Sequence, residues 1–142
     1  MSLAGRVDLG HAKRAEEVLQ QIIDVQRGTD LPDEIRRRLK NLPAMLRVNG
    51  VPAALAFYAA KGAGSRPIDR AYRAVGDALC EELYTLLDVP DAQRSPARLF
   101  RTLADHAEHS PSTLAVAFAR LEALAGWMRR LAQASGPDAA DG

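Results

Sequence analysis

Apolar residues recur along most of the chain at intervals of three and four, which is the spacing of one buried face of an α-helix. The clearest stripe consists of Ile68, Tyr72, Val75, Leu79, Leu83 and Leu86. No segment alternates apolar and polar residues convincingly, as a half-buried strand does. The pattern therefore predicts an all-α fold, a compact bundle of helices joined by short connections.

Proline, glycine and serine residues divide the pattern into about six helices within a single domain. These helices are expected to begin near Gly10, Asp30, Pro52, Arg66, Ser95 and Ser110. Pro43 interrupts the second stripe and is expected to kink or end that helix, because proline lacks an amide hydrogen and clashes with the preceding turn. We expect residues 10–134 to form the domain, residues 1–9 a flexible leader and residues 135–142 a flexible tail.

Composition limits the class of protein. A chain of 142 residues is long enough for one hydrophobic core. Its single cysteine, Cys80, excludes an internal disulfide, fits a reducing compartment and lies on an apolar stripe, which favours a buried packing residue over a nucleophile. No signal-peptide pattern opens the chain, and no apolar run approaches the roughly 18–20 residues of a membrane span. We therefore expect a cytoplasmic protein without membrane contact.

The net charge of +1 conceals a strong segregation of charge along the chain. Between Arg36 and Arg73, nine basic residues are opposed by one acidic residue, Asp69. From Ala74 to Asp91 the sign reverses, with five acidic residues and no basic one. This asymmetry is the first indication of a binding function, because a surface of one sign attracts partners of the other.

The basic residues fall into rows at helical spacing. The rows are Arg66, Arg70 and Arg73 on the fourth predicted helix, and Arg36, Lys40 and Arg47 on the second. The first row is offset by two residues, or about 200°, from the apolar stripe, so it is expected to face away from the core. Such rows can bind phosphates in a salt-sensitive way, or they can be a solvated face in which Arg73 pairs with Asp69 or Asp77. The residues alone leave both interpretations open.

No arrangement typical of catalysis is present. His106 and His109 are spaced i, i+3 rather than the i, i+4 of zinc proteases, and no distant third ligand is evident, so a solvated loop is favoured over a metal site. The segment Lys61–Ser65 lacks both the residue order and the preceding strand of a phosphate-binding loop. We expect a protein that is not an enzyme and that needs no metal or cofactor.

Three segments together resemble a known family. They read Leu-Pro-Ala-Met-Leu-Arg-Val-Asn-Gly at 42–50, Ala-Leu-Ala-Phe-Tyr-Ala-Ala-Lys at 54–61, and Glu-Ala-Leu-Ala-Gly-Trp-Met-Arg-Arg-Leu-Ala at 122–132. The chain resembles the small helical subunit of the type III-B (Cmr) CRISPR RNA-targeting effector complex. In that family an L-P-x-x-[IL]-x-x-N-G segment precedes an L-x-F-x-x-x-K helix, and a W-[LM]-[KR]-R-[FL]-A segment closes the final helix.

The resemblance implies a non-catalytic subunit that acts in antiviral defence with the other subunits of the complex. Such subunits stack end to end with copies of themselves and offer a basic face to the guide–target duplex or to the captured target strand. The residues expected to contact guide or target RNA are Arg36, Lys40, Arg47, Lys61, Arg66, Arg70 and Arg73. The acidic segment from Asp77 to Asp91 would then pack head to tail against the basic surface of a neighbouring copy.

Two other functions are weighed against this one. The first is a helical adaptor that binds only proteins, through Trp127 and the leucine-rich faces, without contacting nucleic acid. The second is a helix-turn-helix DNA regulator whose reading helix spans residues 49–61. The second is disfavoured, because that helix is largely alanine and apolar residues and has almost no side chains that read base edges.

Overall fold

The computed structural model describes residues 2–135, and within them the chain forms α-helices and two short 3₁₀ turns but no strand. The helices are α1 (Leu3–Val25), α2 (Asp33–Asn49), α3 (Val51–Lys61), α4 (Pro67–Leu86), α5 (Leu99–His109) and α6 (Pro111–Ala134). The 3₁₀ turns η1 (Asp91–Gln93) and η2 (Pro96–Arg98) lie between α4 and α5. The predicted all-α bundle of about six helices is confirmed. The predicted tail at 136–142 lies outside the described residues.

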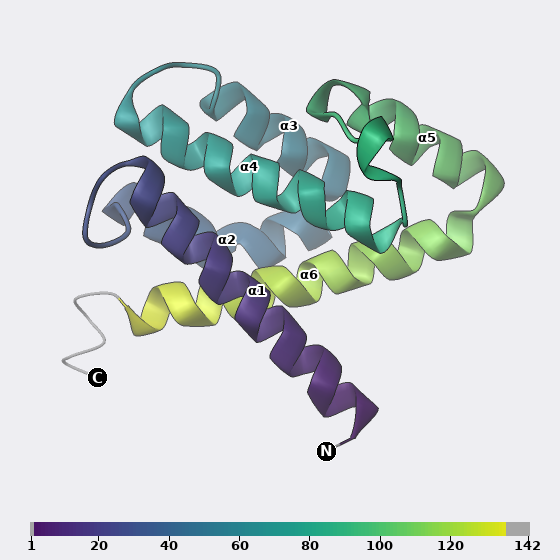
Figure 1. Cartoon of the computed structure of the whole chain (residues 1–142), viewed down its shortest axis with the longest axis horizontal. Helices are drawn as coiled ribbons and strands as arrows, with labels where there is room; N and C mark the ends of the chain where they lie inside the picture. Colours follow the sequence, from purple (N-terminus) through teal and green to yellow (C-terminus); the bar gives the residue numbers. More distant parts are fainter. Residues whose placement is uncertain (1, 136–142) are drawn as a thin grey trace.

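The helices pack around one core (Figure 1). Helix α6 runs along one side of the bundle and contacts α2 and α1, while α3 and α4 lie side by side across the core from it. Helix α1 crosses α6, and its N-terminal half extends beyond the rest of the bundle. The most fully buried aromatic side chains are Tyr58, Tyr72 and Tyr84, each 1% exposed. Tyr72 is therefore a core residue, as its place on the apolar stripe predicted, and Tyr58 is one as well.

The first helix begins earlier than predicted, at Leu3 rather than near Gly10. The side-chain oxygen of Ser2 caps this end by accepting a hydrogen bond from the Gly5 amide at 3.1 Å. Residues 3–9, expected to be a flexible leader, are therefore helical. The serine side chain satisfies one of the first amide groups, which have no partner inside the helix, and so stabilises a helix that begins here. The apolar period of the sequence does not reveal this N-cap.

Helix α2 continues through Pro43, so of the two expected effects of this proline, a kink or an end of the helix, the end is wrong. Pro43 is buried together with its neighbours Leu42 and Leu46. Proline inside a helix costs about 3 kcal/mol, and burial of an apolar side chain contributes roughly 1.5–3 kcal/mol. Burial of this segment against the core is therefore large enough to offset the lost hydrogen bond.

Helix α5 extends to His109, so the segment 105–109, expected to be a solvated loop, forms the last turns of a helix. The His106 ring lies against the Thr102 carbonyl oxygen, with Nδ1 at 3.0 Å, and the His109 ring makes the same contact with the Asp105 carbonyl oxygen. Within residues 2–135, no three His, Cys, Asp or Glu side chains lie close enough together to hold a metal ion.

The connection between α3 and α4 is tightly built around two glycines. A Cβ atom on Gly62 would lie 2.8 Å from both the nitrogen and the Cα of Arg73, and one on Gly64 would lie 2.2 Å from a carboxylate oxygen of Asp69. Glycine is therefore required at Gly62, because the obstacle there is backbone that cannot rotate away. This contact sets how closely the end of α3 approaches α4.

We predict that Gly62→Ala lowers the free energy of unfolding by about 2 kcal/mol, the typical cost of forcing extra volume into a filled site. Gly10→Ala is the matched control, because Gly10 lies in α1 with no atom within 4 Å of the added methyl group. This control should gain about 0.5–1 kcal/mol from helix propensity. Urea denaturation measures both changes, and equal stabilities of the two variants would contradict the close approach at Gly62.

Candidate nucleic-acid interface

The α4 row of arginines is exposed, as its spacing predicted, but its guanidinium groups are engaged with the preceding loop. Arg73 donates from Nε to the Gly62 carbonyl oxygen at 2.8 Å and from Nη2 to the Gly64 carbonyl oxygen. Arg70 donates to the Ser65 carbonyl oxygen at 3.1 Å. These contacts fix the α3–α4 loop. Carbonyl oxygens carry no net charge, and neither Arg70 nor Arg73 forms an ion pair within the described chain.

Arg66 is the member of this row that pairs with an acid. Its guanidinium lies 3.0 Å from Asp69, whose carboxylate also accepts the backbone amide hydrogen of Arg66 at 3.1 Å. The Arg66 guanidinium holds the pKa of the Asp69 carboxyl below its usual range. The suggested pairing of Arg73 with Asp69 or Asp77 is absent from the ion pairs of the described chain.

Arg36 is buried, which corrects its predicted place in an exposed row on α2. Its side chain is 7% exposed and pairs with Asp33 at 2.7 Å and Asp30 at 3.2 Å, while Nη2 donates to the Leu31 carbonyl oxygen at 3.3 Å. Arg36 therefore ties the start of α2 to the segment before it. Its guanidinium is not part of the exposed basic surface.

The other two members of that row, Lys40 and Arg47, lie on the flank of α2 that faces α6. Lys40 is partly exposed, and Arg47 is exposed and bridges to Glu122 of α6 at 2.6 Å. These residues are therefore separated from the arginines of α4. The predicted site residues do not form one continuous face, and the structure divides them between different sides of α2.

A basic surface with aromatic residues lies on the opposite flank of α2. Lys61 places its Nζ 5.9 Å from the ring centroids of both Phe57 and Tyr72, and the Arg38 guanidinium lies 4.9 Å from the Phe57 ring centroid. Arg38 Nε also donates to the Tyr72 hydroxyl at 3.1 Å. Burial raises the pKa of Tyr72, and the nearby Glu34 carboxylate raises it further. The hydroxyl thus stays neutral and does not cancel the charge of Arg38.

Two hollows on this flank meet at Glu34. One, of about 360 Å³, is lined among others by Lys61, Arg66 and Tyr72, and the other, of about 280 Å³, by Arg37, Arg38 and Asn41. We call the cations Arg37, Arg38, Lys61 and Arg66 the α2–α3 basic surface. Two carboxylates also line the hollows, Glu34 and the Asp69 that pairs with Arg66. Four cations against these two acids make a concave surface with a net positive charge, of the kind that phosphate groups bind.

Sequence reasoning included Lys61 and Arg66 of this surface but missed Arg37 and Arg38. A signal for Arg38 was present, because it directly precedes Leu39 of the buried stripe and so lies at its edge. Phe57 and Lys61 are also spaced i, i+4, which places them on one face of α3. Their convergence on Tyr72 needed the packing of α3 on α4, which no local pattern shows.

A second groove lies between α1, α2 and α6, with a volume of about 730 Å³. Trp127 lines it, donating from Nε1 to an Asp8 carboxylate oxygen at 2.7 Å, and the Arg130 guanidinium lies 4.8 Å from a ring centroid of this tryptophan. Arg47 and Arg129 line the same groove. Asp8 belongs to the part of α1 that was expected to be a flexible leader.

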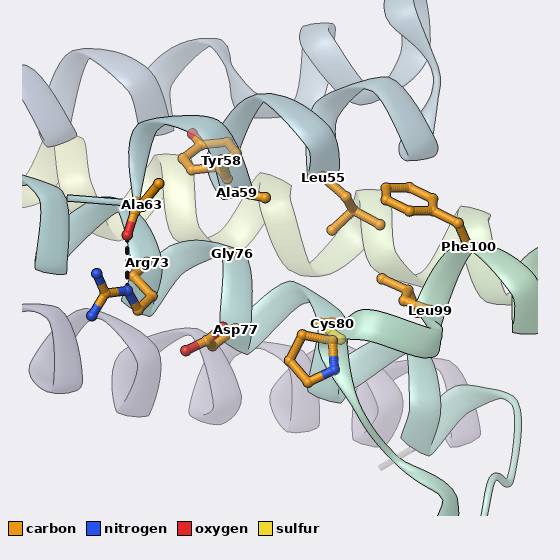
Figure 2. A pocket seen from close by; sticks show the side chains of 12 residues that line it. Leu55, Tyr58, Ala59, Ala63, Arg73, Gly76, Asp77, Cys80, Leu99 and Phe100 are labelled. Carbon is orange, nitrogen blue, oxygen red and sulfur yellow. Dashed lines mark hydrogen bonds between the residues drawn. The ribbon is translucent and has the colours of Figure 1, made fainter.

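A third hollow, of about 300 Å³, lies between α3, α4 and the start of α5 and is mainly apolar (Figure 2). Leu55, Ala59, Leu99 and Phe100 line it, and Arg73 reaches its edge, where the dashed line marks the hydrogen bond to Gly62. Cys80 lies at its base and is buried, as predicted. Burial, with the carboxylates of Asp77 and Glu81, raises the pKa of this thiol to about 11. At neutral pH it is therefore protonated and a poor nucleophile.

Much of the acidic segment is paired within the chain. Glu81 and Asp91 both contact Arg94, and Glu82 lies 3.5 Å from Arg14 of α1. Asp77 and Asp88 are exposed and take no part in the ion pairs of the described chain. None of the helices within residues 2–135 is both long enough and apolar enough to span a membrane.

We predict that Arg36→Ala lowers the free energy of unfolding by about 2 kcal/mol, because it removes two ion pairs and leaves a buried carbonyl without a donor. Arg37→Ala is the matched control next to it, since Arg37 is exposed and makes no side-chain hydrogen bond in the described chain. This control should stay within about 0.5 kcal/mol of the parent. Thermal or urea denaturation gives both values, and a similar loss in the two variants would contradict the structural role of Arg36.

Comparison with known protein families covers the three segments singled out in the sequence. A family model described as CRISPR-associated protein (Cas_Cmr5) matches residues 11–135, which includes all of α2 to α6. No curated protein and no solved structure matches the chain. The chain belongs to the Cmr5 family of CRISPR-associated proteins, which are small subunits of the Cmr effector complex.

Proposed function

We propose that this subunit is non-catalytic and contacts the guide or target RNA of the Cmr complex through exposed cations. Membership of the Cmr5 family supports a role in the Cmr complex, and the cations of the α2–α3 basic surface are able to contact phosphate groups of RNA. The observation that carries the proposal is the arrangement of Arg37, Arg38 and Lys61, which share one concave surface and have no ion-pair partner in the described chain.

The contacts proposed with RNA follow from what each cation is free to do. Arg37 and Lys61 are exposed and can reach a phosphate without breaking a hydrogen bond of the described chain, whereas Arg66 is shared with Asp69. Arg70 and Arg73 present charge from α4, where they hydrogen-bond to the preceding loop. Lys40 and Arg47 would act on the other flank of α2. Arg36 is left out of the proposed contacts because it is buried.

The alternative of a protein adaptor has less support from the packing. Its leucine-rich faces are the core of the bundle: Leu39, Leu79 and Leu121 are all 0% exposed. Phosphate contacts would also explain why basic residues outnumber acidic ones so strongly between Arg36 and Arg73. Aromatic rings on this surface are half-buried or buried, so contact with the RNA backbone is favoured over reading of bases.

We predict that the double variant Arg37→Glu/Lys61→Glu weakens binding of a labelled RNA at least tenfold at low salt. Each reversed charge removes a phosphate contact and adds repulsion. For the parent, the logarithm of the affinity should fall linearly with the logarithm of salt concentration, by about 0.7–0.9 per phosphate contact, and should depend little on RNA sequence. Fluorescence anisotropy measures both, with the subunit alone and in the reconstituted complex.

Arg98→Glu/Arg101→Glu is the matched control for this variant. It makes the same change in net charge at exposed residues of η2 and α5, away from the α2–α3 basic surface. Binding by the control should stay within about threefold of the parent, because only long-range attraction is reduced. Equal losses in the two double variants would show a non-specific charge effect and would contradict the proposed surface. Absence of RNA affinity at low salt would favour the adaptor.

We also propose that copies of the subunit stack head to tail, with the acidic end of α4 against the basic surface of the next copy. Support comes from the opposite charges of the two regions along the chain. Because Glu81 and Glu82 already pair with Arg94 and Arg14, the acids available to a second copy are chiefly Asp77 and Asp88.

Asp77→Asn/Asp88→Asn should therefore weaken self-association at low salt, as followed by sedimentation velocity. Asparagine suits Asp88 because its φ of 57° lies in the left-handed region, which asparagine tolerates well. Glu16→Gln/Glu108→Gln removes the same charge from exposed sites on α1 and α5 and should leave self-association unchanged. Sedimentation of the Asp77/Asp88 variant identical to that of the parent would rule out this mode of stacking.

A further inference from the structure

The groove between α1, α2 and α6 is separate from the α2–α3 basic surface. Helix α2 contributes Pro43 and Arg47 to this groove, whereas it contributes Arg37, Arg38 and Asn41 to the other surface. These two sets of positions point to different flanks of one helix of 3.6 residues per turn. We call it the Trp127 groove, and the α2–α3 basic surface does not account for it.

Trp127 is held in one orientation at the wall of this groove. Its ring nitrogen donates to Asp8 at 2.7 Å, a contact between residues 119 positions apart in the chain. The Arg130 guanidinium lies over the ring at 4.8 Å from its centroid. The side chain is only partly buried, and the neighbouring Gly126 has no atom within 4 Å of the place where a Cβ would lie. An aromatic ring fixed in this way beside open space can act as a stacking platform.

The charges of the groove favour an anionic ligand. Arg129 and Arg130 are exposed and have no ion-pair partner within residues 2–135. Arg47 is shared with Glu122, and within residues 2–135 the only other acid that lines the groove is Asp8, whose carboxylate accepts the Trp127 hydrogen bond. Three guanidinium groups against two carboxylates, both already engaged, leave a net positive groove with free donors.

Its polarity excludes the simpler occupants. Polar surface outweighs apolar surface in the groove, so an apolar helix of a partner protein would bury unpaired arginines there at a high cost. A bare phosphate or other small anion would use the arginines but not the tryptophan. A nucleotide uses both, because its base stacks on an aromatic ring or a guanidinium plane and its phosphate binds guanidinium groups.

We propose that the Trp127 groove binds a single-stranded segment of RNA. One base stacks beside the Trp127–Arg130 pair, and Arg129 and Arg47 contact the adjoining phosphates. This inference rests on the proposed RNA-binding function but places an unpaired nucleotide on the flank of α2 opposite the α2–α3 basic surface. Because stacking is available to every base, the site is selective for unpaired strands over duplex and not for a sequence.

The chain carries its own reporter for this site, because Trp127 is the one tryptophan in the sequence. Titration with a labelled short oligouridylate at low salt gives two signals from one sample. Anisotropy of the label reports binding anywhere on the subunit, and the emission of Trp127 reports occupancy of the groove. We expect saturable quenching of Trp127 emission that follows the anisotropy curve, and much weaker quenching by a blunt RNA duplex of the same length.

Arg129→Ala/Arg130→Ala should weaken the quenching affinity at least fivefold. Arg98→Ala/Arg101→Ala removes the same charge elsewhere and should change it less than twofold. Circular dichroism of each variant shows whether the helical fold is kept.

The outcomes separate this inference from the function on which it rests. Binding by anisotropy with unchanged Trp127 emission would overturn the groove as an RNA site and leave the α2–α3 basic surface standing. Equal weakening by the two alanine pairs would likewise overturn it, because the effect would then be one of overall charge. No anisotropy change at low salt would overturn the proposed function and the groove together.

Discussion

Helix α2 is fixed by an apolar stripe that the rest of the bundle surrounds. Ile35, Leu39 and Leu42 are 0% exposed, and Leu46 is 4% exposed. At roughly 1.5–3 kcal/mol for each buried side chain, this stripe leaves the helix no freedom to rotate about its axis. The positions of its basic residues follow from that constraint: Arg36 is turned inward, Arg37 and Arg38 lie on one flank, and Arg47 lies on the other.

The same constraint explains how a chain with little net charge can hold two cationic surfaces. Half of the 18 acids lie on α1, on α4 from Asp77 onward and in the turns after it, where several are paired with Arg14 and Arg94. In the middle of the chain, Arg36, Arg47 and Arg66 pair with carboxylates, whereas the partners of Arg38 and Arg73 include an aromatic ring and carbonyl oxygens. Such partners orient a charge without cancelling it, and long-range attraction to a polyanion is therefore preserved.

The helices could be predicted from the sequence because their apolar period is strong and their ends carry glycine, proline or serine. Sequence reasoning also placed Tyr72 and Cys80 in the core correctly. It failed where the deciding partner lies outside the local pattern. Pro43 stays helical because of what it packs against, and Arg36 is buried because α2 meets the preceding segment at Leu31. The exposed α4 row was predicted from spacing, but its contacts with Gly62 and Gly64 depend on the approach of α3 to α4.

The projecting end of α1 bears on the thermodynamics of the Trp127 groove. A helix of 23 residues is about 34 Å long. Within residues 2–135, its first turns make one side-chain hydrogen bond to the rest of the bundle, from Trp127 to Asp8. These turns are expected to open locally with a small free energy, well below that of global unfolding. Opening removes one wall of the groove, so any ligand that needs this wall selects the closed state and raises the protection of the first α1 amides against hydrogen exchange. Order at the N-terminus and occupancy of the groove are thus linked quantities, and each can be measured through the other.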